Sequence, residues 1–224
     1  FQKKREHGNV IDVGAKDDVT RVLGGRGVYT GVKNTTLGLE GAYQFGTLTY
    51  SSALYPNDTS LTADNSYKRR AWALQATATY VPEIEKLKKY DTVISGSFTH
   101  LSGQKDGSTE SHYEGWDAMF EDQGGGTVFN AIMGYSNANF SNVSVSCIPM
   151  EDVKLVVDYY NILLDKEYQS RTNLFLSGAA STAQYAVDSG RHLGDEVDVK
   201  LVYDYTEDVQ FGLNAGWFMP GPVF

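Results

Sequence analysis

The segment Leu193–Met219 has the clearest hydrophobic pattern in the chain, because apolar and polar side chains alternate along two successive runs. One parity of the first run holds Leu193, Val197, Val199, Leu201, Tyr203 and Tyr205, and the other holds Glu196, Asp198, Lys200 and Asp204. After Thr206–Asp208, the run Val209–Met219 alternates in the same way. A period of two predicts β-strands, so we expect a hairpin with one apolar and one charged face. A dry core excludes such charges, whereas the wall of a membrane β-barrel combines both kinds of face.

The same alternation recurs along the chain and predicts nine strand segments. They are Phe1–Arg5, Val19–Val32, Thr36–Leu48, Lys68–Tyr80, Asp91–Ser102, Phe140–Ile148, Val153–Asp165, Leu193–Tyr205 and Val209–Met219. The connections alternate between long (Glu6–Asp17, Thr49–Ser66, Gly103–Asn139, Lys166–Gly190) and short (Lys33–Thr35, Val81–Tyr90, Pro149–Asp152, Thr206–Asp208). Antiparallel neighbours then place every long loop on one rim, as in outer-membrane barrels. A soluble sandwich has no reason for such an arrangement.

We therefore predict an all-β fold, an antiparallel transmembrane β-barrel of the outer-membrane type, with residues 1–224 as a single domain. Bacterial single-chain barrels usually have an even number of strands, whereas the pattern predicts an odd number. The last run also ends on the rim of the long loops, which would leave an unpaired strand edge in lipid. We expect a partial barrel of about nine strands, completed by strands before Phe1 and after Phe224 or by a second chain.

Composition and charge narrow the function classes. The formal net charge of −9 argues against general nucleic-acid binding. A single cysteine, Cys147, excludes an intramolecular disulfide, and no apolar run is long enough for a transmembrane helix. The four histidines match no zinc spacing, and the acidic segment Glu110–Asp122 lacks the spacing of a calcium loop. No catalytic motif assigns a nucleophile, so we predict neither a metal site, nor a cofactor, nor an enzyme.

Several motifs in the second half resemble the bacterial alginate-export family of outer-membrane β-barrels. Tyr113-Glu-Gly-Trp-Asp-Ala-Met-Phe120 resembles the family's Tyr/Phe-Asp-Pro-Leu-Phe loop, with Ala118 at the proline position. Val143–Lys166 resembles its block of strand, proline turn and strand. Gly190-Arg-His-Leu-Gly-Asp-Glu-Val-Asp-Val199 resembles its entry to a descending strand, and Trp217-Phe-Met-Pro-Gly221 resembles its closing motif. Arg26 and Glu40-x-x-x-Gln44 are also similar to family positions.

This resemblance implies a monomeric pore in the outer membrane of a Gram-negative bacterium, of which the chain would be the later part. It implies outer-membrane lipid and a hydrophilic solute or polysaccharide as partners. The type member carries an anionic polysaccharide through a lumen rich in arginine. The lumen parity of this chain instead mixes acidic and basic residues, which does not favour a polyanion.

Two sets of candidate site residues follow from strand parity. The lumen or solute-facing set is Arg26, Glu40, Gln44, Arg69, Lys154, Asp158, Tyr160, Glu196, Asp198 and Lys200. The lipid-facing aromatic girdle is Tyr29, Tyr43, Trp72, Tyr80, Tyr203 and Trp217. Charged lumen residues form cross-strand ion pairs or tune selectivity, and both roles stay open for the row Glu196, Asp198 and Lys200. We interpret Arg26 and Glu40 as a structural pair.

Three functions are compatible with these patterns. The first is an outer-membrane channel that passes a hydrophilic solute or exopolysaccharide, with Gly103–Asn139 folded inward to narrow the pore. The second is a non-conducting barrel that serves as a sleeve or partner for another secreted or electron-transfer protein. The third is a soluble β-sandwich or carbohydrate-binding module. Conductance in planar bilayers separates the first two, and extraction without detergent identifies the third.

Overall fold

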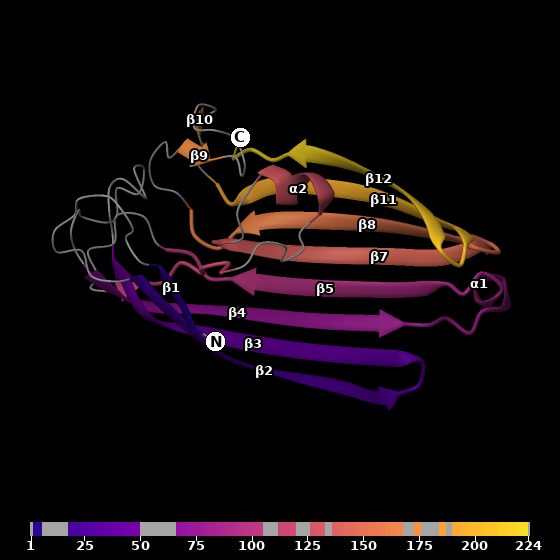
Figure 1. Cartoon of the computed structure of the whole chain (residues 1–224), viewed down its shortest axis with the longest axis horizontal. Helices are drawn as coiled ribbons and strands as arrows, with labels where there is room; N and C mark the ends of the chain where they lie inside the picture. Colours follow the sequence, from indigo (N-terminus) through magenta and orange to yellow (C-terminus); the bar gives the residue numbers. More distant parts are fainter. Residues whose placement is uncertain are drawn as a thin grey trace.

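The computed structural model describes residues 2–5, 18–49, 66–104, 112–119, 126–132, 136–167, 173–175, 184–186 and 190–223. Within these residues the fold is almost entirely β, with nine strands in one antiparallel path that follows the sequence (Figure 1). The strands of this path are β1 (Gln2–Arg5), β2 (Asp18–Val32), β3 (Thr35–Thr49), β4 (Ser66–Tyr80), β5 (Val93–Leu101), β7 (Ala138–Met150), β8 (Val153–Leu164), β11 (His192–Thr206) and β12 (Val209–Pro220). The predicted all-β antiparallel fold is confirmed at this level.

Short connections join the strands at one end of the sheet, as the sequence predicts. Three of them are two-residue turns. In two of these turns Asn34 and Asp152 have positive φ angles of 57° and 65°, a conformation that Asn and Asp tolerate well. The connection after β4 contains one helical turn, α1 (Glu85–Lys88). At this end the Lys33 ammonium donates a 2.8 Å hydrogen bond to Glu83, which lowers the pKa of that carboxyl. Because neighbouring strands are antiparallel, the long connections lie at the opposite end.

The predicted turn Pro149–Asp152 is shorter in the structure. Pro149 and Met150 belong to β7, and only Glu151 and Asp152 form the turn. The register between β7 and β8 shifts between Cys147 and Met150. Such an irregularity accommodates a proline, which has no N–H for the strand ladder.

In the described parts of the segments predicted as long loops, the structure contains four short elements. β6 (His112–Tyr113) pairs in parallel with β4, and α2 (Thr127–Ile132) lies in front of the sheet (Figure 1). β9 (Asn173–Phe175) and β10 (Gln184–Ala186) pair with each other in a separate two-stranded sheet. Elements this short leave no periodic signal in the sequence and depend on tertiary contacts for their stability.

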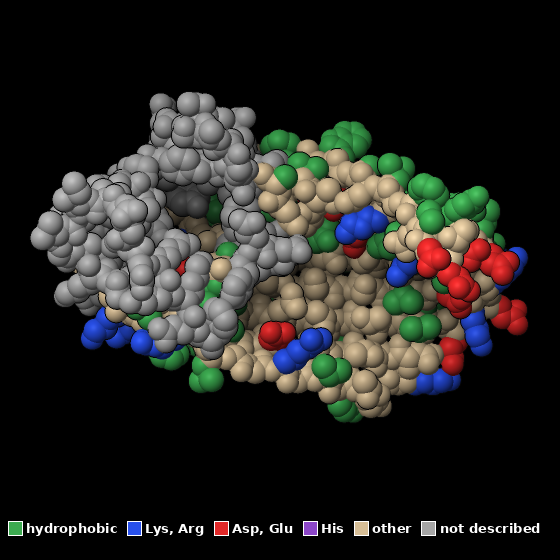
Figure 2. Space-filling view, viewed as in Figure 1, with side chains coloured by type: hydrophobic (Ala, Val, Ile, Leu, Met, Phe, Trp, Pro, Cys, Tyr) green, Lys and Arg blue, Asp and Glu red, His purple; other side chains and the backbone are tan. Residues whose placement is uncertain are grey.

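The two faces of the main sheet have opposite character. On one face, the outer face, large apolar side chains are exposed, including Leu23 at 74% and Trp217 at 73%. On the other face, the inner face, Gln44, Glu196 and Asp198 are fully buried at 0% exposure. Figure 2 shows the inner side as a hollow. This distribution is the reverse of a soluble protein, in which polar groups cover the surface and apolar groups fill the interior.

The path of strands is open within the described residues. There, β12 pairs only with β11, and β1 pairs only with β2. The described part of the chain also contains no helix with the length and hydropathy needed to span a membrane. The structure therefore establishes an open antiparallel sheet with a polar inner face and an apolar outer face.

Candidate functional site on the inner face

Strand register brings charged side chains together on the inner face. Arg26 of β2 lies opposite Glu40 of β3, with Arg26 Nε 4.0 Å from Glu40 Oε2. Both side chains are exposed, at 68% and 53%. The predicted pairing is confirmed, although an exposed pair at this distance contributes little to stability. On β8 and β11, Lys200 Nζ lies 3.9 Å from Asp158 Oδ2.

Asp117 anchors the connection between β5 and β7 to one side of the inner face. Its backbone N–H donates to Gln44 Oε1 at 2.9 Å, and its carbonyl accepts from Gln44 Nε2 at 2.6 Å. The Asp117 carboxylate accepts a hydrogen bond from Thr20 Oγ1 at 3.2 Å and lies 3.6 Å from the Arg69 guanidinium. Strands β2, β3 and β4 each contribute one of these three side chains, so Asp117 ties the connection to three neighbouring strands.

Glu196 and Asp198 anchor the same connection to the other side of the inner face. Glu196 Oε1 accepts the N–H of Val128 at 2.6 Å, and Glu196 Oε2 accepts the N–H of Phe129 at 2.8 Å. Asp198 Oδ2 accepts the N–H and the hydroxyl of Thr127, each at 2.8 Å. These backbone N–H groups begin α2 and have no partner within the helix. Carboxylates near a helix N-terminus also interact favourably with its dipole.

Two glycines allow this close approach. Gly126 has a φ angle of +103°, and a Cβ atom there would lie 2.7 Å from the Glu196 carboxyl carbon. Gly216 of β12 faces the same contact, and a Cβ atom there would lie 2.6 Å from Asp198 Oδ1. At either position an added side chain would force a neighbouring carboxylate to shift, and this shift would disturb its contact with the start of α2.

An apolar cluster, the inner cluster, packs beneath the docked connection. Phe129 is fully buried at its centre, 5.4 Å from the Phe140 ring in an edge-on contact and 6.3 Å from the Phe218 ring. The buried members are Ala71, Leu101, Trp116, Phe129, Ala138, Phe140, Ile162, Leu164, Leu193 and Val223. Tyr160 and Phe218 pack against them. Burial of these side chains favours the docked position of residues 112–119 and 126–130.

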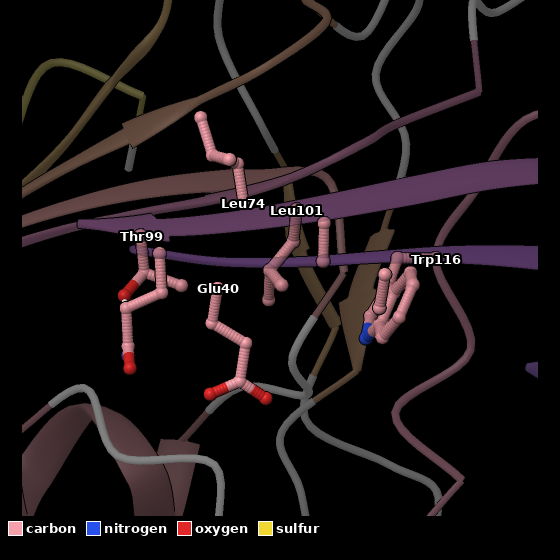
Figure 3. Close-up of a pocket in the computed structure, with 8 residues that line it drawn as sticks. Glu40, Leu74, Thr99, Leu101 and Trp116 are labelled. Carbon is pink, nitrogen blue, oxygen red and sulfur yellow. The ribbon is translucent and has the colours of Figure 1, made fainter. Parts of the chain in front are cut away.

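A cavity of about 240 Å³ lies beside the inner cluster (Figure 3). Glu40, Gln75 and Thr99 contribute polar atoms to it, and Leu101 and Trp116 contribute apolar surface. Gln75 Nε2 donates to Thr99 Oγ1 at 3.0 Å. The cavity therefore combines an indole with hydrogen-bonding groups.

The predicted solute-facing residues fall into two groups. Gln44, Arg69, Asp158, Glu196 and Asp198 are buried. Arg26, Glu40, Lys154, Tyr160 and Lys200 are exposed or half-buried. An ion-pair ladder was one of the two roles left open for the row Glu196, Asp198 and Lys200. Among the described residues only Lys200 forms such a pair, because both carboxylates bind the start of α2 instead. Solute contact by either group stays a prediction.

The predicted girdle residues all lie exposed on the outer face. They are Tyr29, Tyr43, Trp72, Tyr80, Tyr203 and Trp217. Tyr203 and Tyr205 pack edge to face with centroids 6.2 Å apart, and Tyr205 contacts Phe211 at 6.0 Å. Contact of these rings with lipid stays a prediction.

No pattern in the sequence marks the partners of the inner-face carboxylates. Asp117 lies in the Tyr113–Phe120 motif, and Thr127 begins a helix too short to show periodicity. Among the described residues, no group of three or more His, Cys, Asp and Glu side chains lies close enough to hold a metal ion.

No protein-family model matches the chain, and no curated protein matches it. The resemblance to the alginate-export family therefore stays a prediction from the motifs.

Proposed function

We propose that this chain forms part of the wall of an outer-membrane β-barrel that passes a hydrophilic solute along its inner face. The observation that carries the proposal is the inverted distribution of side chains, with apolar residues and aromatic rings exposed outside and charges held inside. An exposed apolar surface of this extent marks a site of contact with lipid or protein. Alternation of apolar and polar faces along every strand is the arrangement that membrane barrels require.

The height of the outer apolar face supports contact with lipid. From Trp72 to Tyr80, β4 advances eight residues, or about 27 Å at ~3.4 Å per residue. A strand tilt of about 40° reduces this to a height of about 21 Å, close to the ~25 Å apolar band of outer-membrane barrels. Charged residues bound this stretch on β4, with Arg70 at one end and Glu83 in the turn beyond the other.

The docked connection between β5 and β7 would narrow the passage. Residues 112–119 and 126–130 are held on opposite sides of the inner face by Asp117 and by the start of α2. Arg26, Glu40, Lys154, Lys200 and Asp204 carry accessible charge on the described part of the inner face. These three bases and two acids nearly balance, so the surface does not select strongly between small ions. The solute in this proposal is therefore a hydrophilic molecule without a strong charge requirement.

The open edges of the sheet require completion in a membrane. Unpaired backbone groups at a strand edge cost several kcal/mol each in hydrocarbon. We therefore propose that further strands, either of this protein or of a partner, pair with the free edges of β1 and β12 and with the part of β2 that β1 does not cover.

A second candidate function is a non-conducting sleeve for another secreted or electron-transfer protein. The inner cluster favours it, because Phe129 and its neighbours fill part of the inner face with apolar side chains. Such a seal would hinder the flow of water and ions.

Single-channel recording in planar bilayers tests the proposal. The purified protein should require detergent for extraction and should give steady conductance after insertion. Insertion without conductance, together with purification only as a complex with a second protein, would support the sleeve. Recovery in the aqueous phase without detergent would contradict both functions.

A further inference from the structure

Three basic side chains lie together on the outer face at the end of the long connections. Arg21 of β2 lies opposite Phe45 of β3, which in turn lies opposite Arg70 of β4. Lys68 lies one outward position further along β4. All three bases are exposed. Since neighbouring strands are about 4.8 Å apart, Arg21 and Arg70 are separated by roughly 10 Å across the sheet. We call these three residues the basic outer patch.

An apolar row borders the basic outer patch on the side of the short turns. Leu23 lies opposite Tyr43, and Tyr43 lies opposite Trp72, in the next outward row of the same strands. All three side chains are exposed. Along each strand the step from the basic row to the apolar row is two residues, or about 7 Å. A ligand that touches both rows must therefore combine charge with apolar character.

The bases of this patch lack acidic partners on the described part of their own face. The neighbouring outward positions of the three strands are Val19, Thr47 and Ser66, and none of them is acidic. On the side of β6, which pairs with β4 at Lys68, the nearest described acidic side chain is Glu114, whose carboxylate lies 3.3 Å from His112 Nε2. Within the described residues, no ion pair joins Arg21, Lys68 or Arg70 to a carboxylate. The chain as a whole has a net charge of −9, so a group of bases without an ion-pair partner among the described residues indicates attraction to an external anion.

We propose that the basic outer patch binds the phosphorylated headgroup of a membrane lipid, whose acyl chains run along Leu23, Tyr43 and Trp72. The inference rests on the proposed membrane location of the sheet. Guanidinium groups form bidentate hydrogen bonds with phosphate oxygens, and a base near an anionic lipid surface adds measurably to membrane binding. The adjoining apolar row favours a lipid over free phosphate, because inorganic phosphate gains nothing from apolar contact.

Binding of purified, detergent-solubilised protein to bis-phosphorylated lipid A in mixed micelles tests this inference. The test variant combines Arg21→Gln, Lys68→Gln and Arg70→Gln. Its matched control combines Lys86→Gln, Lys88→Gln and Lys89→Gln, which remove the same charge at the short-turn end. Dephosphorylated lipid A and inorganic phosphate serve as the other two ligands.

We expect the test variant to bind bis-phosphorylated lipid A at least about tenfold more weakly than the parent protein. The control variant should bind within about twofold of the parent. Dephosphorylated lipid should bind the parent as weakly as the phosphorylated lipid binds the test variant. Equal binding by test and control variants would overturn the proposal. Full competition by inorganic phosphate would assign the patch to free phosphate and would also overturn it.

Insertion into lipid bilayers is measured separately for the parent and the test variant. If both proteins insert and the test variant binds the lipid with the affinity of the parent, lipid binding by the basic outer patch is refuted, while the proposed membrane location stands. If the parent itself does not insert, the proposed function fails together with the inference.

Discussion

The contact between Glu196 and α2 makes a quantitative prediction about how firmly the inner segment is docked. Glu196 is fully buried and accepts two backbone N–H groups, from Val128 and Phe129, at 2.6 and 2.8 Å. A hydrogen bond to a charged group contributes about 1.5–3 kcal/mol. Glu196→Gln keeps one acceptor oxygen, removes the charge and turns an amide N–H₂ towards a second donor. Part of the lost hydrogen-bond energy is offset, because a neutral glutamine costs less to bury than a charged carboxylate.

We expect Glu196→Gln to weaken docking by about 2 kcal/mol, the contribution of one charge-assisted hydrogen bond. This corresponds to a roughly thirtyfold larger fraction of molecules with α2 undocked. The backbone amides of Val128 and Phe129 report this fraction directly, because each is a donor in the affected contact. Hydrogen–deuterium exchange should therefore be about thirtyfold faster at these two amides.

Asp204→Asn is the matched control for this experiment. It removes one negative charge from the same strand, near the turn end, where Asp204 is exposed and contacts Gln210 rather than α2. Exchange at Val128 and Phe129 should not change in the control. If Glu196→Gln and Asp204→Asn give the same exchange rates at these amides, Glu196 does not hold α2 on the sheet.

Further predictions concern the two faces of β11 and β12 and the inner cluster. Leu201→Arg on the outer face should lower the free energy of unfolding by about 2–4 kcal/mol, and Lys200→Leu on the inner face should lower it much less. Denaturant titration in lipid measures both, and equal midpoints would show that the assigned faces are wrong. Gly216→Ala should expose α2 to limited proteolysis, because the new Cβ would lie 2.6 Å from Asp198 Oδ1, whereas Gly212→Ala meets no atom within 4 Å; identical digestion patterns would contradict this reasoning. Phe129→Ala should weaken docking by about 3–5 kcal/mol, the usual cost of truncating a buried phenylalanine, and should raise conductance in planar bilayers; an unchanged conductance would exclude this segment as the constriction.

The alternation of apolar and polar residues was sufficient to predict the strands of the main sheet and their order. The predicted segment Val153–Asp165 became β8 (Val153–Leu164), and Val209–Met219 became β12 (Val209–Pro220). Side-chain parity has a fixed period of two in a strand, so each residue's face follows once a neighbouring residue is placed. Short connections then force antiparallel pairing of consecutive strands, and this pairing placed Arg26 beside Glu40.

Leu193 shows where residue parity by itself fails to predict the face of the sheet on which a side chain lies. Its position predicts the apolar outer face, yet Leu193 is fully buried in the inner cluster. The register between β11 and β8 shifts between His192 and Gly194, and Gly194 has a φ angle of +153°. An irregularity of one residue transfers the side chains before it to the other face, and no feature of the hydrophobic pattern marks it.

By itself, therefore, the sequence determined the all-β class, the strand order and, apart from irregular positions such as Leu193, the residues that share each face, because these depend on neighbours along the chain. Only the tertiary structure decided what covers the inner face. The partners of Glu196 and Asp198 are backbone N–H groups about seventy residues away in sequence, and every residue except proline carries such a group. A contact between a carboxylate and backbone has no residue-specific signature on the backbone side, so it becomes visible only when the chain is folded.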